Sequence, residues 1–198
     1  MKKILISLLA IVIAAALLLA LNFGLNGVAK ANEEKAMAYV TQTMLPGSET
    51  FTEETYTGED TNIVRAWKGE TGFVVETKTY GYADDITLLV SVTNEGKVVG
   101  LKVLDMHETP GLGGNILTEW LFLARFLNTT GGVAIGAPDA EADAFSSATG
   151  TDTAQTETYI DGMSGATVTS KAIARCVNSA VGYVTGADVE SSATTWGG

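Results

Sequence analysis

The stretch of residues 161–170, DGMSGATVTS, constrains the fold of this chain more than any other part of the sequence. It combines an acid, two glycines and several small hydroxyl side chains, which are typical of a tight turn. An apolar-periodic run follows directly, in which Ile173, Val177, Val181 and Val184 are spaced by four, four and three residues. This spacing puts the four side chains on one face of a helix. The sequence therefore predicts a polar turn that leads into an amphipathic helix.

Three hydroxyl residues, Ser164, Thr169 and Ser170, are candidates for the N-cap of this helix. Gly162 and Gly165 allow backbone conformations that are closed to other residues. Free backbone N–H groups and the helix dipole both favour an anion at such a place, so the turn suits a phosphate group. Ser/Thr/Gly turns also precede helices without any ligand, and local chemistry alone favours that simpler interpretation.

The segment from Asp161 to Thr167 resembles the D-x-x-S/T-G-A-T flavinylation motif, and every specified position of that motif is present. The motif belongs to the FMN-binding subunits of the Rnf and Nqr membrane redox complexes. In length the chain is more similar to the G-type subunit of Rnf than to its longer Nqr relative. The resemblance implies that Thr167 carries FMN through a phosphoester bond. It also implies a separate flavin transferase that uses FAD as the donor.

The remaining residues of this stretch acquire their expected roles from the resemblance. Those before Thr167 would shape the turn and be read by the transferase, and the helix expected to begin near Thr169 would stabilise the charge of the phosphodiester. The candidate cofactor-site residues here, besides Thr167, are Asp161, Ser164, Gly165, Ala166, Thr169 and Ser170.

A second motif lies in residues 107–114, HETPGLGG. Three glycines and a proline within five residues predict a loop, which allows a ligand to approach the backbone closely. Taken alone, the loop is as consistent with a plain turn as with a ligand site. It also resembles the E-T-P-G-L-G segment that lines the cofactor in the same family, which makes Glu108, Thr109, Gly111, Leu112 and Gly113 candidate cofactor-binding residues. His107 stands where the family commonly has a basic residue, and no catalytic role is assigned to it.

Between the N-terminal region and this loop the pattern is strand-like from Phe51 onward. Segments 73–80, 86–92 and 98–104 are rich in β-branched and aromatic residues, and a turn signal lies at 94–97. They predict an antiparallel meander covered by helices, that is, an α+β fold. Tyr82, in the turn between the first two of these strands, is a candidate for stacking on a flavin, although an aromatic residue at a sheet edge has the same appearance.

The N-terminal region begins with Lys2 and Lys3, followed by a run of 18 residues at 4–21 that is apolar except for Ser7. As a helix it would be about 27 Å long, close to the hydrocarbon thickness of a bilayer. We expect a retained transmembrane anchor over residues 4–25, with residues 1–3 in the cytoplasm. A cleaved secretory signal is the alternative. Both interpretations put the rest of the chain outside the cytoplasmic membrane.

The other segments complete the expected organisation. Residues 26–50 form a linker and a juxtamembrane helix at 33–45, and residues 51–185 form the FMN-binding domain. Within the domain, 116–127 is expected to be a helix and 136–157, which has no lysine or arginine, a long acidic surface loop. Residues 186–198 are expected to be a disordered tail.

Composition excludes several classes of function. The formal net charge of −11 argues against nucleic acid as a partner, since that needs a basic surface. One histidine and one cysteine leave almost no material for a zinc site or a Cys/His nucleophile pair. The cysteine, Cys176, lies within the predicted C-terminal helix, where a small buried core residue is expected.

The resemblance implies an electron-carrying subunit of an Rnf-type ion-translocating ferredoxin:NAD oxidoreductase. Its partners would be the other membrane subunits, the flavin transferase and the membrane, and catalysis would belong to the complex. Two alternatives remain open from the sequence. One is a stand-alone flavinylated electron carrier outside the cytoplasm, and the other is an anchored interaction module in which the two motifs are only turns.

Overall fold

The computed structural model describes residues 13–14, 16–17, 27–29, 31–117, 120–130, 132–136 and 158–186. The chain divides into two compact units, Met1–Val40 and Thr41–Gly198. Among the described residues no helix has both the length and the apolar character needed to span a bilayer. Most of the apolar run at 4–21, on which the predicted anchor depends, lies outside the described residues.

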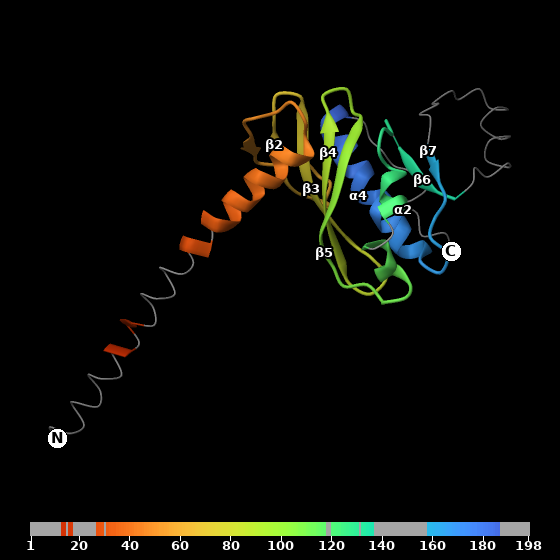
Figure 1. Cartoon of the computed structure of the whole chain (residues 1–198), viewed down its shortest axis with the longest axis horizontal. Coiled ribbons are helices and arrows are strands. Elements are labelled where there is room, and N and C mark those ends of the chain that lie inside the picture. Colours follow the sequence, from red (N-terminus) through yellow and green to blue (C-terminus); the bar gives the residue numbers. More distant parts are fainter. Residues whose placement is uncertain are drawn as a thin grey trace, which may run out of the picture. The chain divides into compact units, whose positions relative to one another are not determined.

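The second unit is built on a five-stranded antiparallel sheet in which the strands follow the chain order (Figure 1). Its strands are β1 (Thr52–Glu54), β2 (Ile63–Lys68), β3 (Gly72–Tyr80), β4 (Asp85–Thr93) and β5 (Val98–Met106). The three strands predicted from β-branched and aromatic residues are confirmed within two residues at each end, as is the antiparallel α+β architecture. The strand-like pattern between Phe51 and residue 73 does not delimit individual strands, so the sequence predicts neither β1 nor β2 as separate elements.

Helix α4 (Thr167–Thr185) covers one face of the sheet and packs mainly against β3 and β4. The predicted apolar face is confirmed, since Ile173, Val177 and Val181 are fully buried in the core. Cys176 is buried with them, and this burial raises the pKa of its thiol to about 12. The helix ends at Gly186, which has a φ of 67° in the left-handed region, where glycine is favoured.

The opposite face of the sheet is contacted by the first residues of this unit. Residues 31–44 are helical, close to the predicted 33–45. The carbonyl oxygen of Met44 lies 3.1 Å from where a Cβ on Gly100 of β5 would be, and Leu45 is only 1% exposed. Val74 and Leu89, which point to this face, are fully buried. A layer on each face explains why the strands do not alternate strictly between apolar and polar residues.

The segment after the sheet differs from the single helix predicted at 116–127. It contains the 3₁₀ helix η1 (Gly113–Leu117) and the short helix α2 (Trp120–Ala124). Beyond α2, the N–H groups of Arg125, Phe126 and Leu127 bond to carbonyls three residues earlier. The chain thus tightens into turns instead of continuing as an α-helix.

A two-stranded parallel sheet, β6 (Val133–Ile135) with β7 (Thr158–Ile160), was not predicted. The buried amide of Asn178 on α4 joins it to the core by bonding both the N–H and the C=O of Val133, at 2.8 and 2.9 Å. The predicted acidic loop at 136–157 and the predicted tail at 186–198 fall almost entirely outside the described residues.

Candidate cofactor site

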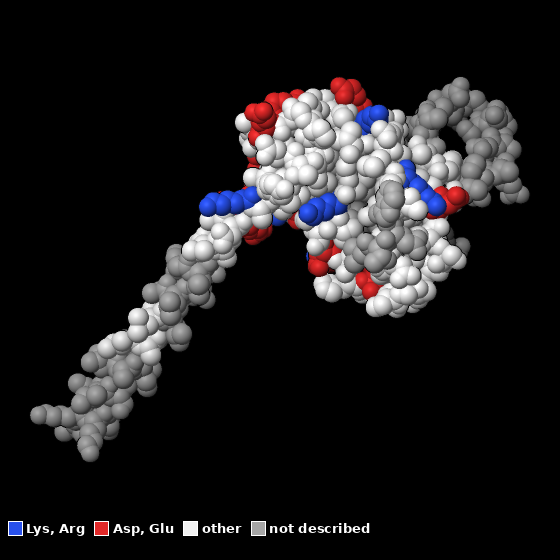
Figure 2. Space-filling view, in the orientation of Figure 1, with Lys and Arg blue, Asp and Glu red and all other residues white. Residues whose placement is uncertain are grey.

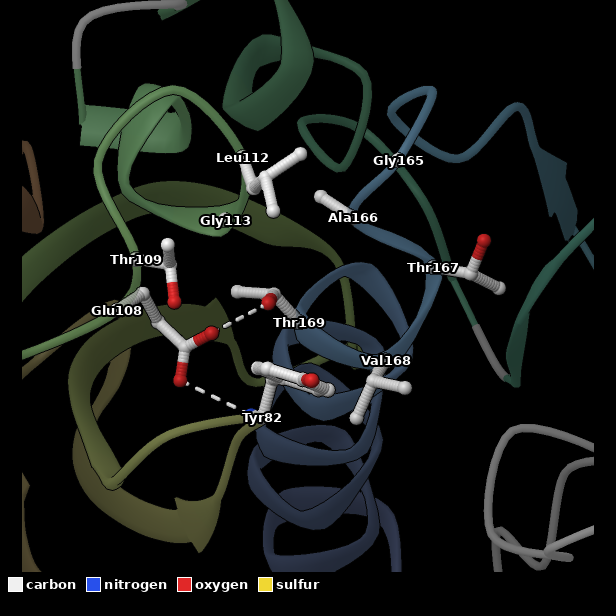
Figure 3. A pocket seen from close by; sticks show the side chains of 10 residues that line it. All are labelled: Tyr82, Glu108, Thr109, Leu112, Gly113, Gly165, Ala166, Thr167, Val168 and Thr169. Carbon is white, nitrogen blue, oxygen red and sulfur yellow. Dashed lines mark hydrogen bonds between the residues drawn. The ribbon is translucent and has the colours of Figure 1, made fainter.

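A cavity of about 330 Å³ opens where three segments of the second unit meet. The segments are the turn between β3 and β4, the loop before η1, and the start of α4, as Figure 3 shows. The lining residues are Tyr82, Glu108, Thr109, Leu112, Gly113, Gly165, Ala166, Thr167, Val168 and Thr169. Nine of the thirteen site residues predicted from the sequence are among them. Val168 is the lining residue that was not predicted.

Glu108 connects the three segments. Its Oε1 accepts hydrogen bonds from the backbone N–H groups of Tyr82 at 2.9 Å and Ala83 at 3.0 Å. Its Oε2 accepts a hydrogen bond of 2.6 Å from the hydroxyl of Thr169 (Figure 3). The side chains of Glu108 and Thr169 therefore bond to each other and stabilise the cavity wall, and both residues are buried.

Two glycines make this close approach possible. A Cβ on Gly113 would lie 2.4 Å from the Thr169 hydroxyl oxygen and 2.7 Å from Glu108 Oε2, and a Cβ on Gly81 would lie 2.4 Å from Glu108 Oε1. A side chain at either position would have to displace the carboxylate. The loop glycines were predicted to let a ligand approach the backbone, but at Gly113 the groups that come close are the side chains of Thr169 and Glu108.

The predicted side-chain N-cap of α4 is wrong. The N-cap position is Ala166, with φ −132°, and no side chain caps the first turn. Thr169 and Ser170 lie inside the helix, where Thr169 bonds to Glu108 and Ser170 bonds to the carbonyl of Ala166. Because Glu108 and the carbonyl of Ala166 accept from these two hydroxyls and no side chain caps the helix, the amide groups of the first turn keep their capacity for another acceptor.

Thr167 is the first residue of α4, and its side chain is exposed. In Figure 3 it lies at the opposite side of the cavity from Glu108 and Thr109. The preceding Gly165 has a φ of 75° in the left-handed region, and a Cβ there would lie 3.1 Å from Leu112 Cδ2. The turn thus presents a hydroxyl to solvent at the edge of a cavity, beside the positive end of a helix.

Four predicted site residues lie outside this cavity: Gly111, Asp161, Ser164 and Ser170. The Ser170 hydroxyl accepts from the backbone N–H of Met163 at 3.1 Å and so braces the turn from inside. The carbonyl of Asp161 accepts a 2.9 Å hydrogen bond from Arg125 Nη1. These contacts give Asp161 and Ser170 a part in shaping the turn.

Ser164 lines a second cavity of about 360 Å³, which shares Leu112 with the first. Its walls include Asn115, Leu121, Phe122 and Arg125. No local sequence signal marks Arg125, which is an arginine within an expected helix. The turn of residues 161–167 therefore contributes to both cavities, the first of which is lined by Glu108 and the second by Arg125.

The two exposed apolar side chains of the first cavity are Tyr82, 65% exposed, and Leu112, 45% exposed. Together with the polar atoms of the loop they form an open site that suits a flat, amphipathic ring.

His107 lies outside the cavity, and its Nδ1 is 3.5 Å from Oδ1 of Asp105. Among the described residues no group of acidic, histidine or cysteine side chains could hold a metal ion. Figure 2 shows small, separate groups of charged side chains on one face of the molecule and no extended basic area there.

Comparison with known proteins decides the family. The model of the FMN-binding domain family matches residues 81–182, a range that contains both motifs and the whole cavity. The chain belongs to the FMN-binding domain family. The resemblance drawn from the two motifs is thereby confirmed.

Curated relatives refine this picture. The chain is 37% identical over 113 residues to the G-type subunit of the proton-translocating ferredoxin:NAD(+) oxidoreductase complex of Clostridium ljungdahlii, in a match that covers 57% of this chain and 53% of the relative. It is 35% identical over 103 residues to the G-type subunit of the ion-translocating oxidoreductase complex of Pseudomonas aeruginosa. That match covers 52% of this chain and 43% of the relative. The matched part thus spans about half the length of these relatives.

Among solved structures, the chain is similar to the C-type subunit of the Na(+)-translocating NADH-quinone reductase of Parabacteroides distasonis. The TM-score is 0.45 at 22% sequence identity, and the match covers 61% of this chain and 60% of that one.

Proposed function

We propose that this chain is a membrane-anchored electron-transfer subunit of an Rnf-type ion-translocating ferredoxin:NAD oxidoreductase, with FMN joined by a phosphoester bond to Thr167. The observation that carries the proposal is the position of Thr167. It is an exposed hydroxyl at the first residue of a helix, on the edge of a cavity built from both family motifs. A buried hydroxyl at this position would have argued against attachment.

The residues present fit the phosphate end of FMN. The ester oxygen would be that of Thr167, and the uncapped first turn of α4 offers backbone N–H groups to the phosphate oxygens. The helix dipole contributes about 0.3–1 kcal/mol to such an anion, so the covalent bond dominates retention of the cofactor. Gly165, with its positive φ, lets the turn fold back so that the hydroxyl meets the cavity edge.

The residues present also fit the ring. Tyr82 and Leu112 offer exposed apolar surface on two sides of the cavity, while Thr109 adds a polar group. When bound, the flavin supplies the redox chemistry, and the protein supplies its position and surroundings. In this proposal the chain selects no substrate and relays electrons between neighbouring cofactors.

We further propose that the domain lies outside the cytoplasmic membrane, anchored by a helix over residues 4–25, and that the other membrane subunits of the complex are its partners. The names of the curated relatives, which are subunits of such complexes, support this, as does the 18-residue apolar run after Lys2 and Lys3. Maturation would require a flavin transferase with FAD as the donor. The transferase would read the exposed turn around Asp161 and Ser164.

Thr167→Val tests the attachment. The full chain is produced together with a flavin transferase, and intact mass and in-gel flavin fluorescence after denaturation are measured. The wild-type chain and Thr167→Ser, which keeps a hydroxyl, should carry one FMN, and Thr167→Val should carry none. Thr109→Val, which removes another hydroxyl from the same cavity, should retain the covalent flavin. An unmodified wild-type chain, or fluorescence that persists in Thr167→Val, would contradict the proposal.

A further inference from the structure

Glu108 is a buried carboxylate in the wall of a cavity that we assign to a flavin. It is 7% exposed, and its two oxygens accept hydrogen bonds from Tyr82 N–H, Ala83 N–H and the Thr169 hydroxyl. Its three hydrogen-bond partners in the described part of the chain are all donors, so both oxygens of Glu108 act as acceptors, as carboxylate oxygens do. The sequence indicated only that Glu108 contacts the cofactor. Its hydrogen bonds point to a different part in the site.

We propose that Glu108 is a positioning residue with two effects on the flavin, an inference that rests on the proposed function. First, it joins the Tyr82 turn to the first turn of α4 through its hydrogen bonds. This keeps the Tyr82 ring and the attachment point at Thr167 in a fixed position relative to each other. Second, its negative charge opposes reduction of the ring. The four residues Tyr82, Ala83, Glu108 and Thr169 are called the Glu108 clamp below.

The clamp joins segments that are far apart in the sequence. Glu108 and Thr169 are 61 residues apart, and Glu108 and Tyr82 are 26 apart. Thr169 lies in the same helical turn as Thr167, so the carboxylate ties the attachment helix directly to the turn that carries the exposed Tyr82 ring. The absence of a side chain at Gly81 and Gly113 lets this carboxylate come so close to both segments.

The charge of Glu108 is not balanced by a cation in the cavity. None of the ten lining residues is basic, and the ion pairs found among the described residues do not include Glu108. Reduction adds negative charge to a flavin, and this charge is repelled by the carboxylate of Glu108, which is screened only in part by water because the residue is 7% exposed. A fixed anion in the wall therefore disfavours the reduced ring relative to the oxidised one.

Two variants separate the clamp from the charge. Glu108→Gln has nearly the same shape and keeps an oxygen for Tyr82 and Ala83 but loses the charge. Glu108→Asp keeps the charge but is shorter by one methylene, so it no longer reaches both Thr169 and the Tyr82 turn. Asp84→Asn is the matched control, because Asp84 is an exposed carboxylate on the same turn.

The clamp is measured without any flavin, as amide hydrogen exchange at Tyr82 and Ala83 in chains that also carry Thr167→Val. Exchange should be at least about tenfold faster in Glu108→Asp, because the shorter side chain cannot hold the Tyr82 turn and Thr169 together. It should stay within about threefold of the parent in Glu108→Gln, which keeps an oxygen for both amides. Unchanged exchange in Glu108→Asp would overturn the positioning role. Circular dichroism confirms that each variant is folded.

The charge is measured on flavin-loaded chains by redox titration. The equilibrium between reduced and oxidised flavin should shift about tenfold toward the reduced form in Glu108→Gln, and by less than about threefold in Glu108→Asp and Asp84→Asn. No shift in Glu108→Gln would overturn the charge role. A wild-type chain that takes up no flavin would overturn the proposed function and the charge role together, while amide exchange would still decide the clamp.

Discussion

The first turn of α4 and the rest of the same helix are organised in opposite ways. From Ile173 to Val181 the helix buries apolar side chains against the sheet, and its C-terminal end is closed by Gly186 in the left-handed conformation. The first turn has no side-chain cap, and its first residue, Thr167, is exposed. The two parts of one helix thus have different roles: the buried part stabilises the fold, and the first turn offers groups that can bind a ligand. Core packing fixes its position, which leaves its N-terminus free to receive an anion.

The largest expected effect lies in the buried part of the helix. Ile173→Ala removes a fully buried side chain between α4 and the sheet, so the free energy of unfolding should fall by about 2–5 kcal/mol. Urea denaturation monitored by circular dichroism measures this loss. The chains that remain folded should still accept FMN at Thr167. A loss of FMN attachment among folded chains would show that the buried part of α4 also affects the site at its first turn, which would contradict the comparison.

An intermediate effect is expected at Thr169, where the two parts meet. Thr169→Val removes the hydroxyl donor to Glu108 and should lower the free energy of unfolding by about 1 kcal/mol, because the carboxylate keeps its two backbone donors. Thr169→Ser keeps the hydroxyl and is the control in the same denaturation experiment. A loss as large as that of Ile173→Ala would mean that the first turn also carries the stability of the helix.

The smallest effect on stability is expected at the exposed end. Thr167→Val should change the free energy of unfolding of the unmodified chain by no more than about 0.5 kcal/mol, since the Thr167 side chain is exposed. Thermal or urea unfolding of chains produced without a flavin transferase checks this. A destabilisation of several kcal/mol would show that this hydroxyl has a structural role, and the comparison would then fail.

Much of the fold was predictable because its signals are local. The spacing of Ile173, Val177 and Val181 predicted the buried face of α4, and β-branched segments predicted the three central strands. The helix predicted at 116–127 is confirmed only in part, as η1 and the short α2, because apolar spacing does not show where a chain tightens into turns. The pairing of β6 with β7 is held from a distance by Asn178, and no local pattern could predict it.

The sequence by itself determined the two motifs, the family that they resemble and the threonine that ends the first motif, because short segments of fixed composition carry this information. That the last helix begins at this threonine, and not near Thr169 as expected, was decided by the tertiary structure. Only the tertiary structure decided which hydroxyls are engaged. Thr169 and Ser170 were expected at the cap but bond to Glu108 and Ala166, and Glu108 faces the protein as well as the cavity. The physical reason is that a buried polar group must take whatever partner the fold brings near it, and for Glu108 that partner lies 61 residues away.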